Sequence, residues 1–158
     1  MSNEDLKFMS EALEEARNAF TRQEVPVGAI LVFEGKIIAR ASNCVEELQD
    51  ATAHAEIVCI REAARILGNW RLNQSTLYCT LEPCAMCAGA MILSRVKRLV
   101  YGARDLRHGV DGSWASLIRE PHPIHVVEVE GGVLAEESAE LMRRFFQERR
   151  DAKSRTPF

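Results

Sequence analysis

The sequence contains no apolar run long enough to cross a lipid bilayer. A membrane-spanning helix needs about 18 consecutive apolar residues, and no stretch of this 158-residue chain approaches that length. The first residues are acidic and amphipathic, without the basic and then apolar pattern of a secretory leader. We therefore expect a protein with no membrane partner that stays in the cytoplasm.

The chain contains five cysteines, an odd number. Two of the five cysteines, Cys84 and Cys87, form a Cys-x-x-Cys pair. An odd count without any sign of export argues against a disulfide framework and in favour of reduced thiols. The remaining cysteines, Cys44, Cys59 and Cys79, are expected to act as small apolar side chains within the fold.

Low-complexity tracts and internal repeats are also absent. Hydrophobic residues make up 47% of the chain and charged residues 27%, close to the composition of a soluble globular domain. A chain of this length buries one substantial core and is too short for two ordinary domains. Residues 1–158 are therefore expected to form a single domain.

Apolar periodicity predicts the order of helices and strands. It indicates a helix over residues 6–20, followed by a β-hairpin of residues 27–33 and 36–40. Further helices are expected from an N-cap at Thr52 to Gly68, from Pro83 to Leu93, and over 135–150, with strands at 76–80, 98–102 and 124–129. This order predicts an α/β fold, a three-layer α/β/α sandwich with a mixed five-stranded sheet.

The net charge of −3 conceals an uneven distribution of charges. Residues 1–62 contain 6 Lys/Arg and 12 Asp/Glu, whereas the remainder contains 14 and 11. Two basic clusters lie in this second part: Arg95, Lys97, Arg98, Arg104 and Arg107, and then Arg143, Arg144, Arg149, Arg150, Lys153 and Arg155. Such clusters suit phosphate contact, but solvated helix faces would give the same counts.

His54-Ala55-Glu56, followed by Cys84 and Cys87, supplies three ligands for one zinc ion and a carboxylate that need not be a ligand. A structural zinc normally has four protein ligands, whereas a hydrolytic zinc keeps one position for water and works with a nearby base. Cys84 and Cys87 are three positions apart, so they lie on the same side of a helix. His54 at a second helix start would bring two helix N-termini to the ion.

His54 and Glu56 are two positions apart and would point in nearly opposite directions within a helix. We therefore expect His54 to bind the metal and Glu56 to serve as general base and proton shuttle. This combination is the signature of zinc-dependent nucleobase deaminases. A structural zinc site would need a fourth ligand, which no second Cys-x-x-Cys or His pair supplies, and a redox Cys-x-x-Cys would leave His54 and Glu56 without a role. His108, His122 and His125 are expected to have surface or structural roles.

Three segments resemble the bacterial-type tRNA-specific adenosine deaminases: Thr80-Leu-Glu-Pro-Cys-Ala-Met-Cys-Ala-Gly-Ala-Met-Ile92, Thr52-Ala-His-Ala-Glu56 and Tyr101-Gly-Ala-Arg-Asp105. The similarity continues through Val25-Pro-Val-Gly-Ala29 to Phe145-Phe146. It implies a cytidine-deaminase-like fold, a homodimer, one Zn²⁺ per subunit and no dissociable organic cofactor. It also implies hydrolytic deamination of adenosine to inosine at the wobble position of a tRNA anticodon. Zinc-bound hydroxide would attack C6 while Glu56 moves the protons.

The resemblance further implies contacts with a tRNA anticodon stem-loop. Asn43 would contact the target nucleoside, Asp105 the ribose of the neighbouring 5′ nucleotide, Phe146 the loop, and Arg149 and Arg150 the phosphates. Ala55 would be a further substrate- or RNA-binding residue. One of Phe145 and Phe146 is expected to pack inward and the other to be exposed. Where the family often carries Asn, this chain has Ile124.

Two other functions fit the same residues. One is a small-molecule deaminase acting on guanine, cytosine or a free nucleoside in a closed pocket, which needs no basic path for RNA. The other is a non-catalytic, zinc-stabilised RNA-binding module, in which replacing Glu56 would remove no activity.

Overall fold

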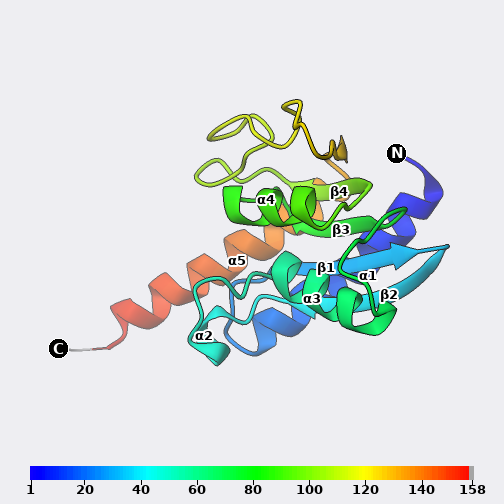
Figure 1. The fold of residues 1–158 in the computed structure, drawn as a ribbon. Helices are drawn as coiled ribbons and strands as arrows, with labels where there is room; N and C mark the ends of the chain where they lie inside the picture. The colour runs from blue at the N-terminus through cyan, green and yellow to red at the C-terminus, as the bar shows by residue number, and fades with distance from the viewer. Residues whose placement is uncertain (157–158) are drawn as a thin grey trace.

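The computed structural model, which describes residues 1–156, is built on one five-stranded sheet with helices on both faces (Figure 1). The helices are α1 (Asn3–Thr21), α2 (Val45–Leu48), α3 (Ala55–Leu67), α4 (Ala85–Leu93) and α5 (Ala135–Ser154). The strands are β1 (Gly28–Phe33), β2 (Lys36–Ser42), β3 (Thr76–Leu81), β4 (Arg98–Ala103) and β5 (Glu128–Glu130).

The strands lie in the order β2-β1-β3-β4-β5. Strand β1 is antiparallel to both β2 and β3, whereas β3, β4 and β5 run parallel to one another. The predicted α/β/α sandwich with a mixed five-stranded sheet is therefore confirmed. Among residues 1–156, no helix is long and apolar enough to cross a membrane.

Alternate side chains of the strands build two separate cores. Ala29 and Leu31 of β1 pack into the cluster that contains the buried faces of α3 and α4. Ile30 and Val32 of the same strand pack with the apolar stripe of α1. Successive side chains of β1 thus pack on opposite faces of the sheet, as expected for a central strand that is covered on each side.

Helices α1 and α5 approach the sheet closely because two strand positions lack a side chain. A Cβ atom on Gly28 would lie 2.1 Å from the carbonyl oxygen of Ala12 in α1. A Cβ atom on Gly102 would lie 2.5 Å from Oγ of Ser138 in α5. Gly28 allows the backbone of α1 to rest directly on β1, and Gly102 leaves room for the Ser138 side chain of α5 against β4.

Several element boundaries differ from the prediction. Thr52 does not cap α3, because its hydroxyl donates to Asp50 at 2.7 Å; His54 is the N-cap instead. Cys84 is the N-cap of α4, so Pro83 precedes that helix and does not lie in its first turn. The single-turn helix α2 was not among the predicted elements, and α5 extends to Ser154, beyond the predicted residue 150.

The last strand is also shorter than predicted. Only residues 128–130 pair with β4, whereas 124–127 form no ladder. Ile124 and Val126 are each 55% exposed, so their alternation with polar residues does not mark a buried strand face.

The topology brings three chain segments to one end of the sheet. Strands β2, β3 and β4 all point the same way, because β2 and β3 are each antiparallel to β1 and β4 is parallel to β3. Asn43 follows β2, Cys84 follows β3 and Asp105 follows β4. Residues distant in sequence therefore meet at the carboxyl ends of these strands, the usual position of a site in an α/β sheet.

Candidate active site

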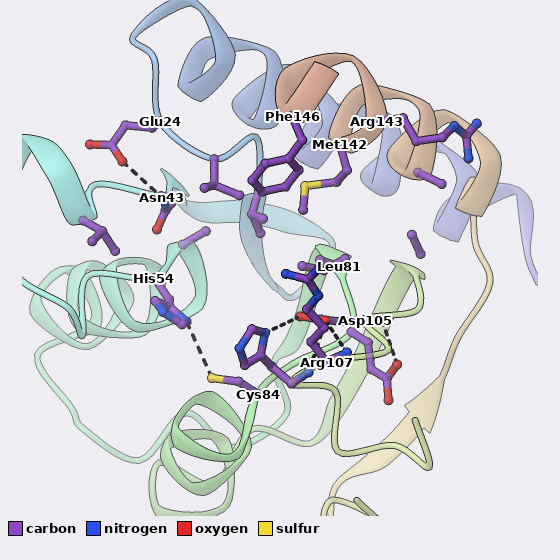
Figure 2. A pocket seen from close by; sticks show the side chains of 18 of the residues that line it. Glu24, Asn43, His54, Leu81, Cys84, Asp105, Arg107, Met142, Arg143 and Phe146 are labelled. Carbon is purple, nitrogen blue, oxygen red and sulfur yellow. Dashed lines mark hydrogen bonds and ion pairs between the residues drawn. The ribbon is translucent and has the colours of Figure 1, made fainter. Parts of the chain in front are cut away.

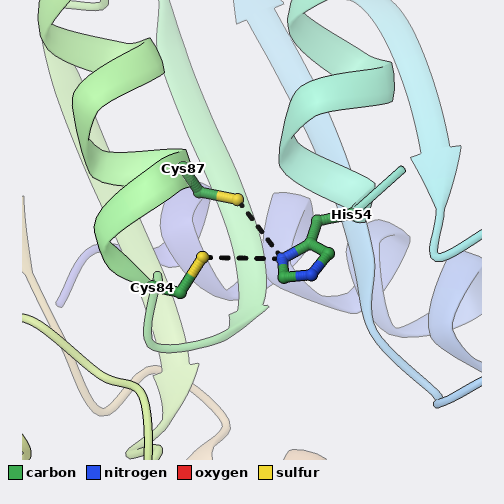
Figure 3. Close-up of side chains that lie close together, drawn as sticks. All are labelled: His54, Cys84 and Cys87. Carbon is green, nitrogen blue, oxygen red and sulfur yellow. Dashed lines mark hydrogen bonds between the residues drawn. The ribbon is translucent and has the colours of Figure 1, made fainter. Parts of the chain in front are cut away.

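His54, Cys84 and Cys87 meet between the N-termini of α3 and α4 (Figure 3). Nδ1 of His54 lies 3.5 Å from Sγ of Cys84 and 3.6 Å from Sγ of Cys87. Potential ligand atoms of all three side chains lie within 4.8 Å of one another. The structure thus brings together the three residues that the sequence pattern selects.

The geometry of this group fits zinc. Tetrahedral zinc with Zn–N near 2.0 Å and Zn–S near 2.3 Å separates a nitrogen and a sulfur ligand by roughly 3.5 to 3.6 Å, which agrees with the observed distances. His54 and Cys84 are the N-cap residues of α3 and α4, so both side chains lie at helix starts. Within residues 1–156, no further His, Cys, Asp or Glu joins the group. Three protein donors fit a catalytic zinc site better than a structural one, which normally has four.

The local environment favours a thiolate in this group. Hydrogen bonding from Cys87, together with that from His54, lowers the pKa of Cys84 to about 4. The start of α4 adds a favourable helix dipole. By contrast, Cys59 and Cys79 are fully buried, and burial raises the pKa of both thiols. These two cysteines lie outside the group, consistent with their expected packing role.

Glu56 lies in the first turn of α3 and is only 5% exposed. It lines the same cleft as His54 and Cys84 but does not belong to the potential ligand group. His54 has an extended backbone, with φ −68° and ψ 151°, so the mid-helix geometry that would point these two side chains apart does not apply. Burial raises the pKa of Glu56. A carboxyl group that holds its proton more tightly than usual is suited to accept and return protons.

The cleft around these residues has a volume of about 1380 Å³. Its walls include the remaining residues expected to contact substrate: Asn43, Ala55, Asp105, Phe146, Arg149 and Arg150. Asn43 and Ala55 are buried, the side chain of Asp105 is partly buried, and Phe146 is 40% exposed. Figure 2 shows Phe146 and Met142 reaching down from α5 above the site that His54 and Cys84 form. One cleft therefore contains the whole set.

The two basic clusters of the sequence differ in where their side chains lie. Arg143, Arg144, Arg149 and Arg150 of α5 all line the cleft. The earlier cluster is dispersed: Arg98 pairs with Asp5 and Glu130, and Arg95 lies over the ring of Trp70. Only Arg104 and Arg107 of that cluster reach the cleft. The first cluster is therefore not a continuous basic surface.

Two buried carboxylates that line the cleft, Glu82 and Glu24, were not identified from the sequence. Glu82 accepts hydrogen bonds from the backbone N–H groups of Asp105 at 3.0 Å and Asp111 at 2.8 Å, and so anchors the segment after β4. Glu24 accepts from the Asn43 side chain and from the start of α2. The available signal was an acid beside an apolar, proline-containing stretch in both Glu24-Val25-Pro26 and Leu81-Glu82-Pro83.

Among known families, residues 2–103 match the cytidine and deoxycytidylate deaminase zinc-binding region. The chain is 49% identical to the tRNA-specific adenosine deaminase of Bacillus subtilis, covering 95% of this chain and 93% of that protein. It is 50% identical to the chloroplastic tRNA(adenine(34)) deaminase of Arabidopsis thaliana over 89% of its own length. It spans only 12% of that longer protein.

The chain is also similar to solved structures of deaminases. One structure from a study of A-to-I editing by tRNA:A34 deaminases at the wobble position is 48% identical, with a TM-score of 0.82 over 85% of this chain and 98% of that one. A guanine deaminase from Nitrosomonas europaea is 26% identical, with a TM-score of 0.75 over 91% and 84% of the two chains.

Proposed function

The chain belongs to the tRNA-specific adenosine deaminases of the cytidine and deoxycytidylate deaminase family, and we propose that it converts adenosine to inosine at the wobble position of a tRNA anticodon. The observation that carries this proposal is the convergence of three potential zinc ligands and a buried glutamate in one cleft rimmed by arginines. The product is inosine and the leaving group is ammonia.

His54, Cys84 and Cys87 would hold one zinc ion per subunit. When bound, zinc supplies the Lewis acidity that makes water a nucleophile near neutral pH. Glu56 accepts a proton from the attacking water and delivers protons to N1 and to the departing amine of adenine. Its burial next to the metal ligands excludes bulk water from these transfers.

Substrate contacts follow from the same cleft. Asn43 and Ala55 bind the target nucleoside, and Asp105 contacts the ribose of the 5′ neighbour. The target base has to leave the stacked loop to reach Glu56, as in other enzymes that act on a nucleobase. Phe146 offers a partly exposed ring to the loop, and Arg149 and Arg150 supply positive charge for its phosphates.

The size and charge of the cleft favour RNA over a small molecule. Pockets for small ligands usually measure roughly 300 to 1,000 Å³, and this cleft exceeds that range at about 1380 Å³. Four arginines of α5 line the cleft; Arg143 is paired with Glu136 and Glu140, and Arg144, Arg149 and Arg150 offer positive charge to RNA phosphates. The guanine deaminases are nevertheless similar in fold, so free guanine is the substrate to test as the alternative.

The proposal includes a homodimer of single-domain subunits in the cytoplasm. An apolar groove between α3 and α4, lined by Ile60, Ala64, Trp70, Ala90 and Leu93, supports self-association. Trp70 is 52% exposed and Leu93 is 61% exposed, and burying these side chains against a second copy would be favourable. The zinc-binding thiols fit a reducing compartment such as the cytoplasm.

One experiment tests substrate and chemistry together. The purified protein is incubated with tRNA, and the anticodon nucleosides are then analysed by mass spectrometry. Inosine at the wobble position is the expected product. Release of ammonia from free guanine, with unchanged adenosine in the tRNA, would favour the small-molecule reading instead.

A further inference from the structure

Glu24 is a buried acid at the edge of the cleft with no role in zinc binding. It is 2% exposed and lies four positions before β1. Oε1 accepts a hydrogen bond from the backbone N–H of Glu47 at 2.6 Å. Oε2 accepts from the backbone N–H of Glu46 at 3.2 Å and from Nδ2 of Asn43 at 3.3 Å. Both carboxylate oxygens are therefore used as acceptors.

This arrangement fixes which way the Asn43 amide points. A carboxylate without a proton accepts hydrogen bonds and donates none, so the NH₂ group of Asn43 must face Glu24. The amide oxygen is then directed away from Glu24, as Figure 2 shows. Asn43 is 6% exposed and lines the cleft, so the oxygen that it presents there is an acceptor held in one orientation.

We infer that Glu24 is a positioning residue for deamination, acting through Asn43. The inference rests on the proposed function, in which Asn43 contacts the target nucleoside. Glu24 touches neither the zinc ligands nor Glu56 by any hydrogen bond in residues 1–156. Its effect on the reaction is the orientation of one amide and of the α2 start beside it.

The backbone around Asn43 is held independently of Glu24. The N–H of Asn43 donates to the carbonyl of Val27 at 3.0 Å, and the N–H of Cys44 donates to the carbonyl of Ala53 at 3.0 Å. Removing the Glu24 carboxylate should therefore release the amide rather than unfold the segment. This separation makes the role testable without loss of the fold.

The test compares wild-type protein with Glu24→Gln on a tRNA anticodon stem-loop. Glutamine keeps the size of the side chain but replaces one accepting oxygen with an NH₂ donor, which must face either the amide of Asn43 or an N–H of α2. We expect kcat/KM for inosine formation to fall about 10- to 100-fold, because small misplacement of a substrate contact has effects of this size. The Kd for the stem-loop should stay within about twofold of the wild-type value, because phosphate contacts mainly determine it. The zinc content should match that of the wild type.

A double-mutant cycle separates positioning from a general structural effect. In an Asn43→Ala background, Glu24→Gln should cause less than about a twofold further loss, because the residue through which it acts is gone. Glu47→Gln is the matched control, since it removes an exposed carboxylate from α2, the helix whose start binds Glu24, and should leave kcat/KM unchanged.

Full activity of Glu24→Gln, or losses that multiply in the double mutant, would overturn the inference while leaving the proposed function intact. Absence of inosine with the wild-type protein would overturn the proposed function itself, and the positioning role with it.

Discussion

Asp5 and Arg98 form a two-point ion pair across 93 positions of the chain, with Nη1–Oδ1 at 2.7 Å and Nη2–Oδ2 at 3.1 Å. The hydroxyl of Tyr78 donates to the same carboxylate at 2.9 Å, and Arg98 also binds Glu130. One nearly buried carboxylate therefore joins the first turn of α1 to strands β3, β4 and β5.

Replacing Asp5 should destabilise the fold in a pH-dependent way. The Arg98 guanidinium holds the pKa of Asp5 well below its usual range. A depressed folded pKa gives stability that is complete above the unfolded value of about 3.9 and is lost as the pH falls toward the folded value. Asp5→Asn should therefore cost about 3 to 5 kcal/mol at pH 7, and the difference from wild type should shrink below about pH 4.

Urea unfolding at pH 7, 5 and 3 measures this difference. Glu14→Gln is the control, because it removes an exposed acid from the same helix and should shift the unfolding free energy by less than about 0.5 kcal/mol. Equal stability of Asp5→Asn and wild type at pH 7 would show that the ion pair contributes nothing.

Glu56→Gln should abolish deamination while leaving the metal site in place. The amide keeps the shape of the side chain but cannot carry protons, and loss of a general acid–base group typically lowers the rate by about 10²- to 10⁴-fold. The expected result is no measurable inosine, with one zinc per chain by elemental analysis and an unchanged circular dichroism spectrum. Wild-type turnover by this variant would remove Glu56 from the mechanism.

Zinc binding should depend on Cys84 and not on Cys59. Cys84→Ser removes a ligand, so this variant should retain little zinc and show no loss of Tm on chelator treatment, whereas chelation should lower the Tm of wild-type protein. Cys59→Ala deletes a core sulfur that lies outside the zinc group and donates to the Ala39 carbonyl at 3.7 Å, and its zinc content should remain normal. Normal zinc in Cys84→Ser would place the metal elsewhere.

The sequence predicted most reliably those features that depend on a local pattern or on a distinctive combination of residue types. The glycine-containing turn between β1 and β2 and the apolar stripe of α1 are local patterns, and the structure confirms both. The His54, Cys84 and Cys87 group could be predicted because few chemistries need these residues at this spacing. Its two converging helix starts follow from the same pattern.

Other features depend on tertiary contacts that local patterns do not carry. Arg98 and Arg104 are alike in sequence, yet one is paired with Asp5 and the other lines the cleft. Thr52 is a good N-cap residue, but its hydroxyl binds Asp50. The buried role of Glu24 could not be predicted because its hydrogen-bond partners lie about 20 positions away.

Arg149 and Arg150 should supply salt-sensitive binding of tRNA. Replacing both with Gln removes up to two phosphate contacts, so the Kd for a stem-loop should rise and the slope of log Kd against log salt should fall by roughly 1 to 1.5. Inosine formation at saturating RNA should change little. Binding titrations at several salt concentrations measure the slope.

The control for this pair is Arg17→Gln, an exposed position on α1 that pairs only with Glu14 among residues 1–156. Its slope should match that of the wild type. An unchanged slope for the double variant would mean that the basic end of α5 is only a solvated helix face.

Phe145 and Phe146 are adjacent residues of α5 with opposite expected roles. Phe145 is 4% exposed and packs edge-on against Phe20, with ring centroids 5.6 Å apart, whereas Phe146 is 40% exposed and lines the cleft. Phe145→Ala should therefore cost about 3 to 5 kcal/mol of unfolding free energy. Phe146→Ala should cost much less stability but about 1 to 3 kcal/mol of RNA binding, if a loop base stacks on its ring.

Thermal unfolding and stem-loop binding, measured on both variants, decide between these roles. The structure requires the two losses to separate, with stability falling mainly in Phe145→Ala and RNA affinity mainly in Phe146→Ala. If Phe146→Ala instead unfolds like its neighbour and the RNA affinity of the folded fraction is normal, the exposed ring is part of the core of α5. The loop contact must then come from the arginines alone.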